Sequence, residues 1–166
     1  IKTLKEIAAP SDLTRLVHLL LERTDETEQE EIKNTIAATA RKISNPIGRA
    51  DAIKAILPSV QDIKGRCALY RVLGMIGDDS SLPLIRTALA EENEQVHDAA
   101  VRALSDWPTI TPRDDLVKIA RTSSNPVHQV LALRAYLRMV EMDESLSPED
   151  AVRLLKEALA IARRAE

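Results

Sequence analysis

Residues 78–107 read DDSSLPLIRTALAEENEQVHDAAVRALSDW, and this stretch decides the fold that we predict. Its first part places apolar residues three and four positions apart, as on one face of a helix: Leu82, Ile85, Ala88 and Leu89. An acidic run interrupts the pattern, and a second stripe follows: Val96, Ala99, Ala100, Ala103, Leu104 and Trp107. The stretch therefore predicts two short antiparallel helices joined by a tight turn.

The ends of these two helices carry recognisable signals. Ser80 or Ser81 is expected to cap the first helix, and Pro83 follows near its first position, where a missing N–H costs nothing. Asn93 is expected to cap the second helix, and Pro108 to end it. One such pair cannot bury both faces of its second helix, so we expect neighbouring pairs on either side.

Further caps and prolines predict helices along the rest of the chain. The expected segments are the end of a helix at residues 1–9, a helix capped by Ser11, helices over 26–43 (capped by Asp25), 46–57 (from Asn45-Pro46), 60–76 (ending at Gly77) and 112–122 (from Thr111-Pro112), one starting at Asn125-Pro126, and a last one after Ser147. These segments pair naturally, two by two.

Equivalent positions recur with a period in the low thirties. Leu82 and Leu116 are 34 residues apart, and Arg71, Arg102 and Arg134 are 31 and 32 apart. Paired helices with such a period indicate an α-solenoid. We predict an all-α protein, a right-handed superhelix of about four helix pairs plus an additional helix, that forms one domain over residues 1–166.

The pattern resembles the HEAT-repeat family and the related HEAT-like repeats of bacterial proteins. Two stretches carry the resemblance: LPLIRTALAEENEQVHDAAVRALSDW at 82–107 and GRCALYRVLGMIGDDSSLPLI at 65–85. It covers 61–142 well and 11–57 loosely, and His97 stands where the family often has arginine. The resemblance implies a protein-binding scaffold whose second helices line a concave groove. Residues 103–140 also resemble HEAT regions of large multidomain bacterial proteins, some of them exported.

Composition narrows the range of partners and locations. The chain has 166 residues, 45% of them hydrophobic, and a net charge of −3, so we expect no attraction to nucleic acid or anionic membranes. Its single cysteine excludes an internal disulfide. No apolar run approaches the ~20 residues that span a bilayer, so we expect a soluble protein, cytoplasmic or exported. Because the chain starts at Ile1 rather than Met, we expect it to be part of a longer protein.

Four arginines are candidates for a binding surface because they recur on the second helices: Arg71, Arg102, Arg134 and Arg138. If the second helices line a groove, as the resemblance implies, this row could hold carboxylates or phosphates through bidentate bonds. The alternative is that the arginines pair with acidic residues of this chain, such as Asp98 or Glu141.

Two histidines, one cysteine and one tryptophan are further candidates. His97 and His128 are 31 residues apart, so stacking places them on adjacent repeats, and we include both in the candidate binding surface. A zinc site needs three or four ligands, and His18 is distant, so we expect no metal and instead hydrogen bonding near the helix N-termini. Cys67 is expected as a buried small apolar group, and Trp107 as part of the core.

We predict no catalytic residue and no cofactor. The sequence has no Ser/His/Asp order and no glycine-rich phosphate loop, and the adjacent Asp78 and Asp79 fit a structural turn better than acid–base chemistry. The predicted function is a non-enzymatic scaffold for a protein or peptide. The alternative, by resemblance, is a HEAT-like enzyme or ligand-handling protein, similar to a bilin lyase or a DNA glycosylase.

The last helix should leave apolar side chains uncovered. Leu154, Leu155, Leu159 and Ile161 have no following helix to pack against, and solenoid ends normally need a polar cap. We therefore expect a contact through this helix, either with further repeats or with a second copy of the chain.

Overall fold

The computed structural model describes residues 6–162, and within this range it contains helices and no β-strand. The α-helices of the described range are α2 (Leu13–Glu22), α3 (Glu26–Ala40), α4 (Asp51–Ile56), α5 (Ile63–Ile76), α6 (Leu82–Leu89), α7 (Glu94–Ser105), α8 (Arg113–Thr122), α9 (Pro126–Met142) and α10 (Pro148–Ala162). Three 3-10 turns, η1 (Pro10–Asp12), η2 (Leu57–Ser59) and η3 (Asp79–Ser81), precede or follow them. The all-α prediction is confirmed; most of the helix end expected at residues 1–9 falls on 1–5, outside the described residues.

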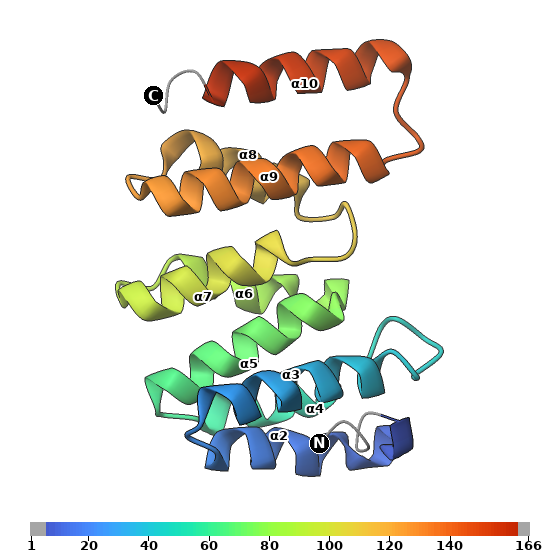
Figure 1. Ribbon diagram of the computed structural model, residues 1–166, viewed down its shortest axis with the longest axis vertical. Coiled ribbons are helices and arrows are strands. Elements are labelled where there is room, and N and C mark those ends of the chain that lie inside the picture. The colour runs from blue at the N-terminus through green and yellow to red at the C-terminus, as the bar shows by residue number, and fades with distance from the viewer. Residues whose placement is uncertain (1–5, 163–166) are drawn as a thin grey trace.

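The helices follow one another in four pairs, α2/α3, α4/α5, α6/α7 and α8/α9, and then α10 (Figure 1). Three of these pairs pack closely, α2 on α3, α6 on α7 and α8 on α9, whereas the short α4 contacts α2. Each second helix packs on the next, α3 on α5, α5 on α7 and α7 on α9, and α10 lies on α9 at the end of the stack opposite α2. This arrangement confirms the predicted solenoid of four pairs plus an additional helix. The right-handed sense of the superhelix stays a prediction.

Small residues bring α5 and α7 close together. A Cβ added at Gly74 on α5 would lie 2.4 Å from the carbonyl oxygen of Ala103 and 2.5 Å from its Cα, so the two backbones touch at this point. The small side chain of Ala103 and the absence of one at Gly74 thus let the two helices approach closely. Trp107 is fully buried beside them, as expected for a core residue.

The adjacent carboxylates Asp78 and Asp79 bond in opposite directions along the stack. Asp78 is fully buried and accepts hydrogen bonds from the backbone N–H of Gly48 (3.0 Å) and of Ala50 (3.1 Å), at the start of the preceding pair. Asp79 accepts a hydrogen bond from the indole N–H of Trp107 (3.0 Å), at the end of its own pair. Both act structurally, and together they join three successive segments of the solenoid.

Several predicted helix signals are confirmed by the backbone contacts. Asp25 accepts from Glu28 N (2.9 Å), Asn93 from the backbone N–H groups of residues 95 and 96, and Asn125 from that of residue 127. Ser147 caps α10 through the N–H of residue 150 (3.0 Å). Gly77 adopts the left-handed conformation, φ 67°, that ends α5.

Three other predicted caps are wrong. Ser11 caps nothing; instead, Asp12 Oδ2 accepts from Ala9 N (2.9 Å). The turn before α6 is capped by Asp78 rather than by a serine, and Asp78 accepts from the N–H of Ser80 (3.0 Å). Thr111 does not cap α8, because its hydroxyl donates to the carboxylate of residue 79 (2.7 Å).

The expected helix start at Asn45-Pro46 is also wrong. Residues 44–50 form bends and turns, and α4 begins only at Asp51. Gly48 takes a positive φ of 101°, which breaks the helical path, and the N–H groups at the start of α4 bond to Asp78 of the next pair. Because Asp78 lies about thirty residues further along the chain, the sequence around the start of α4 contains no sign of this cap. The 26–43 helix likewise ends earlier, at Ala40.

Some apolar positions differ in burial from the predicted stripes. Ile63 on α5 and Val130 on α9 are exposed. On α10, Leu154 and Ile161 pack against the core, whereas an exposed stripe remains: Val152, Leu155 and Leu159. The uncovered end face is thus narrower than expected. The contact expected there, with further repeats or a second copy, stays a prediction.

Candidate binding groove

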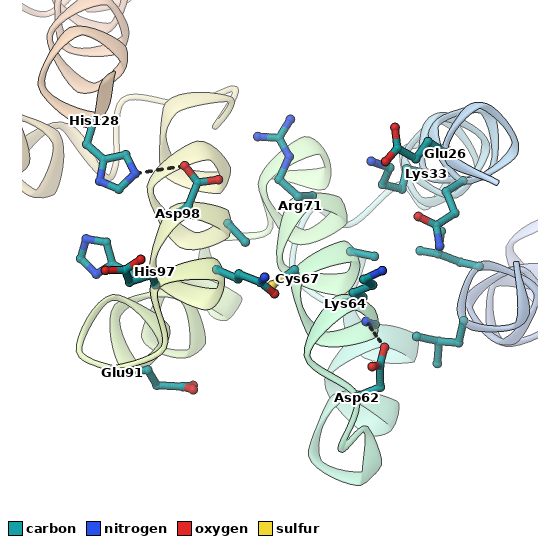
Figure 2. Close-up of a pocket in the computed structure, with 18 of the residues that line it drawn as sticks. Glu26, Lys33, Asp62, Lys64, Cys67, Arg71, Glu91, His97, Asp98 and His128 are labelled. Carbon is teal, nitrogen blue, oxygen red and sulfur yellow. Dashed lines mark hydrogen bonds and ion pairs between the residues drawn. The ribbon is translucent and has the colours of Figure 1, made fainter. Parts of the chain in front are cut away.

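An open groove of about 1020 Å³ runs across the N-terminal ends of α3, α5, α7 and α9. Its apolar floor comes from Leu20, Leu21, Cys67, Ala68 and Ala99. Its charged lining comprises Arg23, Glu26, Lys33, Asp62, Lys64, Arg71, Glu91, Glu92, Glu94 and Asp98, and two histidines complete it (Figure 2). The groove therefore combines an apolar base with polar walls.

The rim of the groove is set by helix N-caps. Asp25, Asp62, Asn93 and Asn125 cap α3, α5, α7 and α9, and each side chain accepts from backbone N–H groups of the first turn. These short side chains fold back onto the backbone and satisfy N–H groups that would otherwise lack a partner at each helix end. Some of the residues that face the groove, such as Glu26 and Glu94, come directly after the caps.

Three of the six predicted binding residues line this groove, and three do not. Arg71, His97 and His128 belong to the lining, whereas Arg102, Arg134 and Arg138 lie outside it. One arginine of the row thus faces the groove, and the other three lie elsewhere. A role of any of the six in binding stays a prediction.

Most of the arginine row bonds within the chain. Arg71 pairs with Asp106 at the end of α7 (2.9 Å), and Arg102 pairs with Asp98 one turn earlier on the same helix (2.8 Å). Arg138 donates to two carbonyl oxygens at the C-terminal end of α7, those of residues 105 and 107. Arg134 is exposed, and within the described residues no side chain pairs with it. Intramolecular pairing, the alternative considered for this row, thus accounts for Arg71 and Arg102.

His97 and His128 stand side by side on adjacent repeats, as their spacing predicted. Their ring centroids are 5.4 Å apart, with an angle of 37° between the planes. His97 Nδ1 lies 2.8 Å from the carbonyl oxygen of Leu89, and His128 Nε2 lies 3.0 Å from Asp98 Oδ1. Hydrogen bonding near the helix N-termini, rather than metal binding, was the expected role. Within residues 6–162, no three His, Cys, Asp or Glu side chains lie together as a metal site requires.

The Asp98 carboxylate bonds to two side chains at this end of the groove, those of Arg102 and His128. Its burial disfavours the charged form, but hydrogen bonds from Arg102 and His128 outweigh that cost and hold the pKa of the Asp98 carboxyl below its usual value. The carboxylate is therefore ionised at neutral pH and fixes the orientation of the His128 ring.

Cys67 lies in the floor of the groove and is only half-buried, so its expected full burial is not observed. Burial raises the pKa of the Cys67 thiol, and nearby carboxylates add to that effect. A thiol with a raised pKa is a poor nucleophile. The Asp98–His128 pair could orient an acid–base imidazole, but within the described residues neither imidazole bonds to a hydroxyl or thiol.

Three groove residues close to the caps were not predicted from the sequence. Lys64, Glu92 and Glu94 line the groove but belong to no sequence motif. The one signal that could have found them is positional, because each lies within a few residues of an N-cap at Asp62 or Asn93.

These observations define an α-solenoid of stacked helix pairs with a groove across one end of its second helices. A family model described as HEAT repeats matches residues 50–136, which is more than half of the chain, and the protein therefore belongs to the HEAT-repeat family. Comparisons with curated proteins and with solved structures found no match. HEAT repeats commonly serve as protein-interaction scaffolds and are generally non-enzymatic. Within the described residues, no helix has the length and apolar character that crossing a membrane requires.

Proposed function

We propose that this protein is a non-enzymatic scaffold that binds an extended segment of a partner protein along the groove of α3, α5, α7 and α9. The observation that carries the proposal is the continuity of the groove across four successive second helices. Packed helices lie about 8–10 Å apart, so the groove spans roughly 30 Å. An extended chain of about nine residues covers that length at ~3.3 Å per residue.

The lining favours a protein segment over other ligands. The apolar floor at Cys67, Ala68 and Ala99 can take small apolar side chains, and the polar walls can bond to a peptide backbone. Six carboxylates and four lysine or arginine side chains line the groove, which is an unsuitable balance for a phosphate backbone. Among the described residues, no Phe, Tyr or Trp side chain on which a base could stack lines the groove.

The lone cysteine allows a direct test, because it lies in the groove floor. Peptides are selected from a random display library on the immobilised protein, and their dissociation constants are measured before and after coupling a bulky maleimide to Cys67. The matched control carries Cys67→Ala with Lys118→Cys, which moves the label to an exposed position on α8, outside the groove. Ala68→Trp fills the groove without any label.

We expect the Cys67 label and Ala68→Trp each to weaken peptide binding at least about tenfold, because a filled groove cannot hold the segment. The Lys118→Cys label should change it less than twofold. Equal effects of the two labels, or a selection that yields no binding peptide, would overturn the proposal. Salt-sensitive binding of duplex DNA in a gel shift would instead support the glycosylase-like alternative.

A further inference from the structure

The end of the groove between α7 and α9 carries two imidazoles whose tautomers are fixed by their partners. The carbonyl oxygen of Leu89 can only accept a hydrogen bond, so Nδ1 of His97, 2.8 Å away, carries the hydrogen. The other nitrogen of that ring, Nε2, is then a lone-pair acceptor when the imidazole is neutral. Among the described residues, no protein donor bonds to it.

The same argument applies to His128. The ionised carboxylate of Asp98 accepts from Nε2 of His128 at 3.0 Å, so Nδ1 is the free acceptor. Although this side chain is only 6% exposed, it lines the groove beside His97. Figure 2 shows the two rings as neighbours on the same side of α7. The mostly buried His128 imidazole thus presents its Nδ1 to the groove as an acceptor without a hydrogen-bond partner among the described residues.

The charges of the groove are divided between its two ends. All four lysine and arginine side chains of the lining come from residues 23–71, on the α3 and α5 side. From residue 91 onward the ionisable lining consists of carboxylates and the two histidines. Glu91 is neutralised by Arg66, and Asp98 by Arg102. Glu92 and Glu94 have no such partner within the described residues, so this end carries excess negative charge.

We propose that this end of the groove, bounded by His97, His128 and Glu94, binds a lysine or arginine side chain of the partner segment. A guanidinium or ammonium group supplies the N–H donors that the two free ring nitrogens lack, and it is attracted by the glutamates. A partner carboxylate is repelled there. An apolar side chain leaves the His128 acceptor buried and unpaired. This inference rests on the proposed function of the groove.

Two near-isosteric substitutions separate the free acceptors from the bonds that hold the rings. In His97→Asn the amide nitrogen takes the place of Nδ1 and can still donate to the Leu89 carbonyl, but Nε2 is gone. In His128→Gln the amide nitrogen replaces Nε2 and can still donate to Asp98, but Nδ1 is gone. His18→Gln is the matched control, because His18 is exposed on α2, outside the groove. Glu94→Gln removes one exposed charge and leaves the buried groups intact.

The probes are the peptides selected on the groove and versions of them in which each lysine or arginine is replaced by glutamine. For the native protein, we expect one basic position whose replacement weakens binding about tenfold or more. In the His97→Asn/His128→Gln protein the same replacement should change binding less than threefold. Glu94→Gln should weaken the basic peptide severalfold, and His18→Gln should leave the native pattern unchanged.

The outcomes distinguish this inference from the proposed function. If peptides bind in the groove, as judged by the Cys67 label, but no basic position matters, the inference is overturned and the proposed function stands. The same conclusion follows if the basic position matters equally in the native and doubly substituted proteins. If no peptide binds the groove at all, both fall.

Discussion

Replacing Asp78 with alanine is expected to destabilise the fold more than any other single loss of a carboxylate in this region. The Asp78 side chain is fully buried and receives two hydrogen bonds from the N–H groups of Gly48 and Ala50, in the preceding helix pair. It also receives the N–H of Ser80 and so caps the turn before α6. One substitution therefore removes a link between pairs and a local cap together.

The magnitude follows from the groups that are left without a partner. Each buried N–H that loses its acceptor costs about 1–3 kcal/mol, and the lost cap costs about 1 kcal/mol more. Because the N–H of Ala50 is buried and that of Gly48 is partly buried, we expect a total loss of about 3–5 kcal/mol. Domains of this kind are stable by about 5–15 kcal/mol, so the loss is a large fraction of the whole.

The assay is urea unfolding followed by circular dichroism, with the free energy of unfolding taken by linear extrapolation. Asp51→Ala is the control, because Asp51 is an exposed residue of the same α4 start and, among residues 6–162, forms an ion pair only with Lys54, three residues on. We expect the control to lose less than about 0.5 kcal/mol. A loss below about 1 kcal/mol for Asp78→Ala, comparable to the control, would refute the reasoning.

The same carboxylate should make the fold sensitive to acid. Burial disfavours its charge, but hydrogen bonds from Ser80, Ala50 and Gly48 outweigh that effect and hold the pKa of Asp78 below its usual value. A depressed pKa contributes stability that is complete above the unfolded-state pKa, about 3.9, and is lost as the pH falls through the folded-state pKa. The stability difference between native protein and Asp78→Ala should therefore shrink below about pH 4.

Three further predictions concern close packing and the thiol. Gly74→Ala should lower the free energy of unfolding by about 2–3 kcal/mol, although alanine has the better helix propensity, because the new Cβ meets the backbone of Ala103 at 2.4 Å. A thermal unfolding curve that matches that of the native protein would contradict this. Gly77→Ala should cost a similar amount, since alanine must adopt φ 67° and would lie 2.2 Å from the Pro108 ring; an unchanged melting temperature would show that the turn can relax. Iodoacetamide should alkylate Cys67 more slowly than an unstructured cysteine peptide at neutral pH, because burial raises the pKa of its thiol, and urea should abolish the difference.

The order and pairing of the helices could be predicted from the sequence because their determinants are local. The apolar stripe at 82–89 and the caps at Asp25, Asn93 and Asn125 all act within one helix turn, and the repeat period then places successive pairs side by side. The start of α4 could not be predicted in this way, because its N–H groups are satisfied by Asp78, about thirty residues away. Contacts between repeats have no short-range signature.

The candidate site was predictable only in part, for a related reason. The spacing of His97 and His128 was enough to place them together, because both lie in the first turn after an N-cap, four residues after Asn93 and three after Asn125. The arginine row shared that regularity, yet Arg71 and Arg138 reach groups at the end of α7 that no periodicity could reveal. The direction of an arginine side chain depends on which bonding groups lie near it in the folded protein, and the repeat period does not give these.

The aspartate and asparagine caps along the groove rim differ from the neighbouring exposed residues in what their replacement would do to the fold. The caps maintain the architecture, whereas the neighbouring exposed positions, such as Glu26, Lys64 and Glu94, make no contact on which the architecture depends. Substitutions at those positions should therefore change the chemistry of the groove at little cost in stability. If the groove binds a partner as we propose, its preference can change while the helices stay in place.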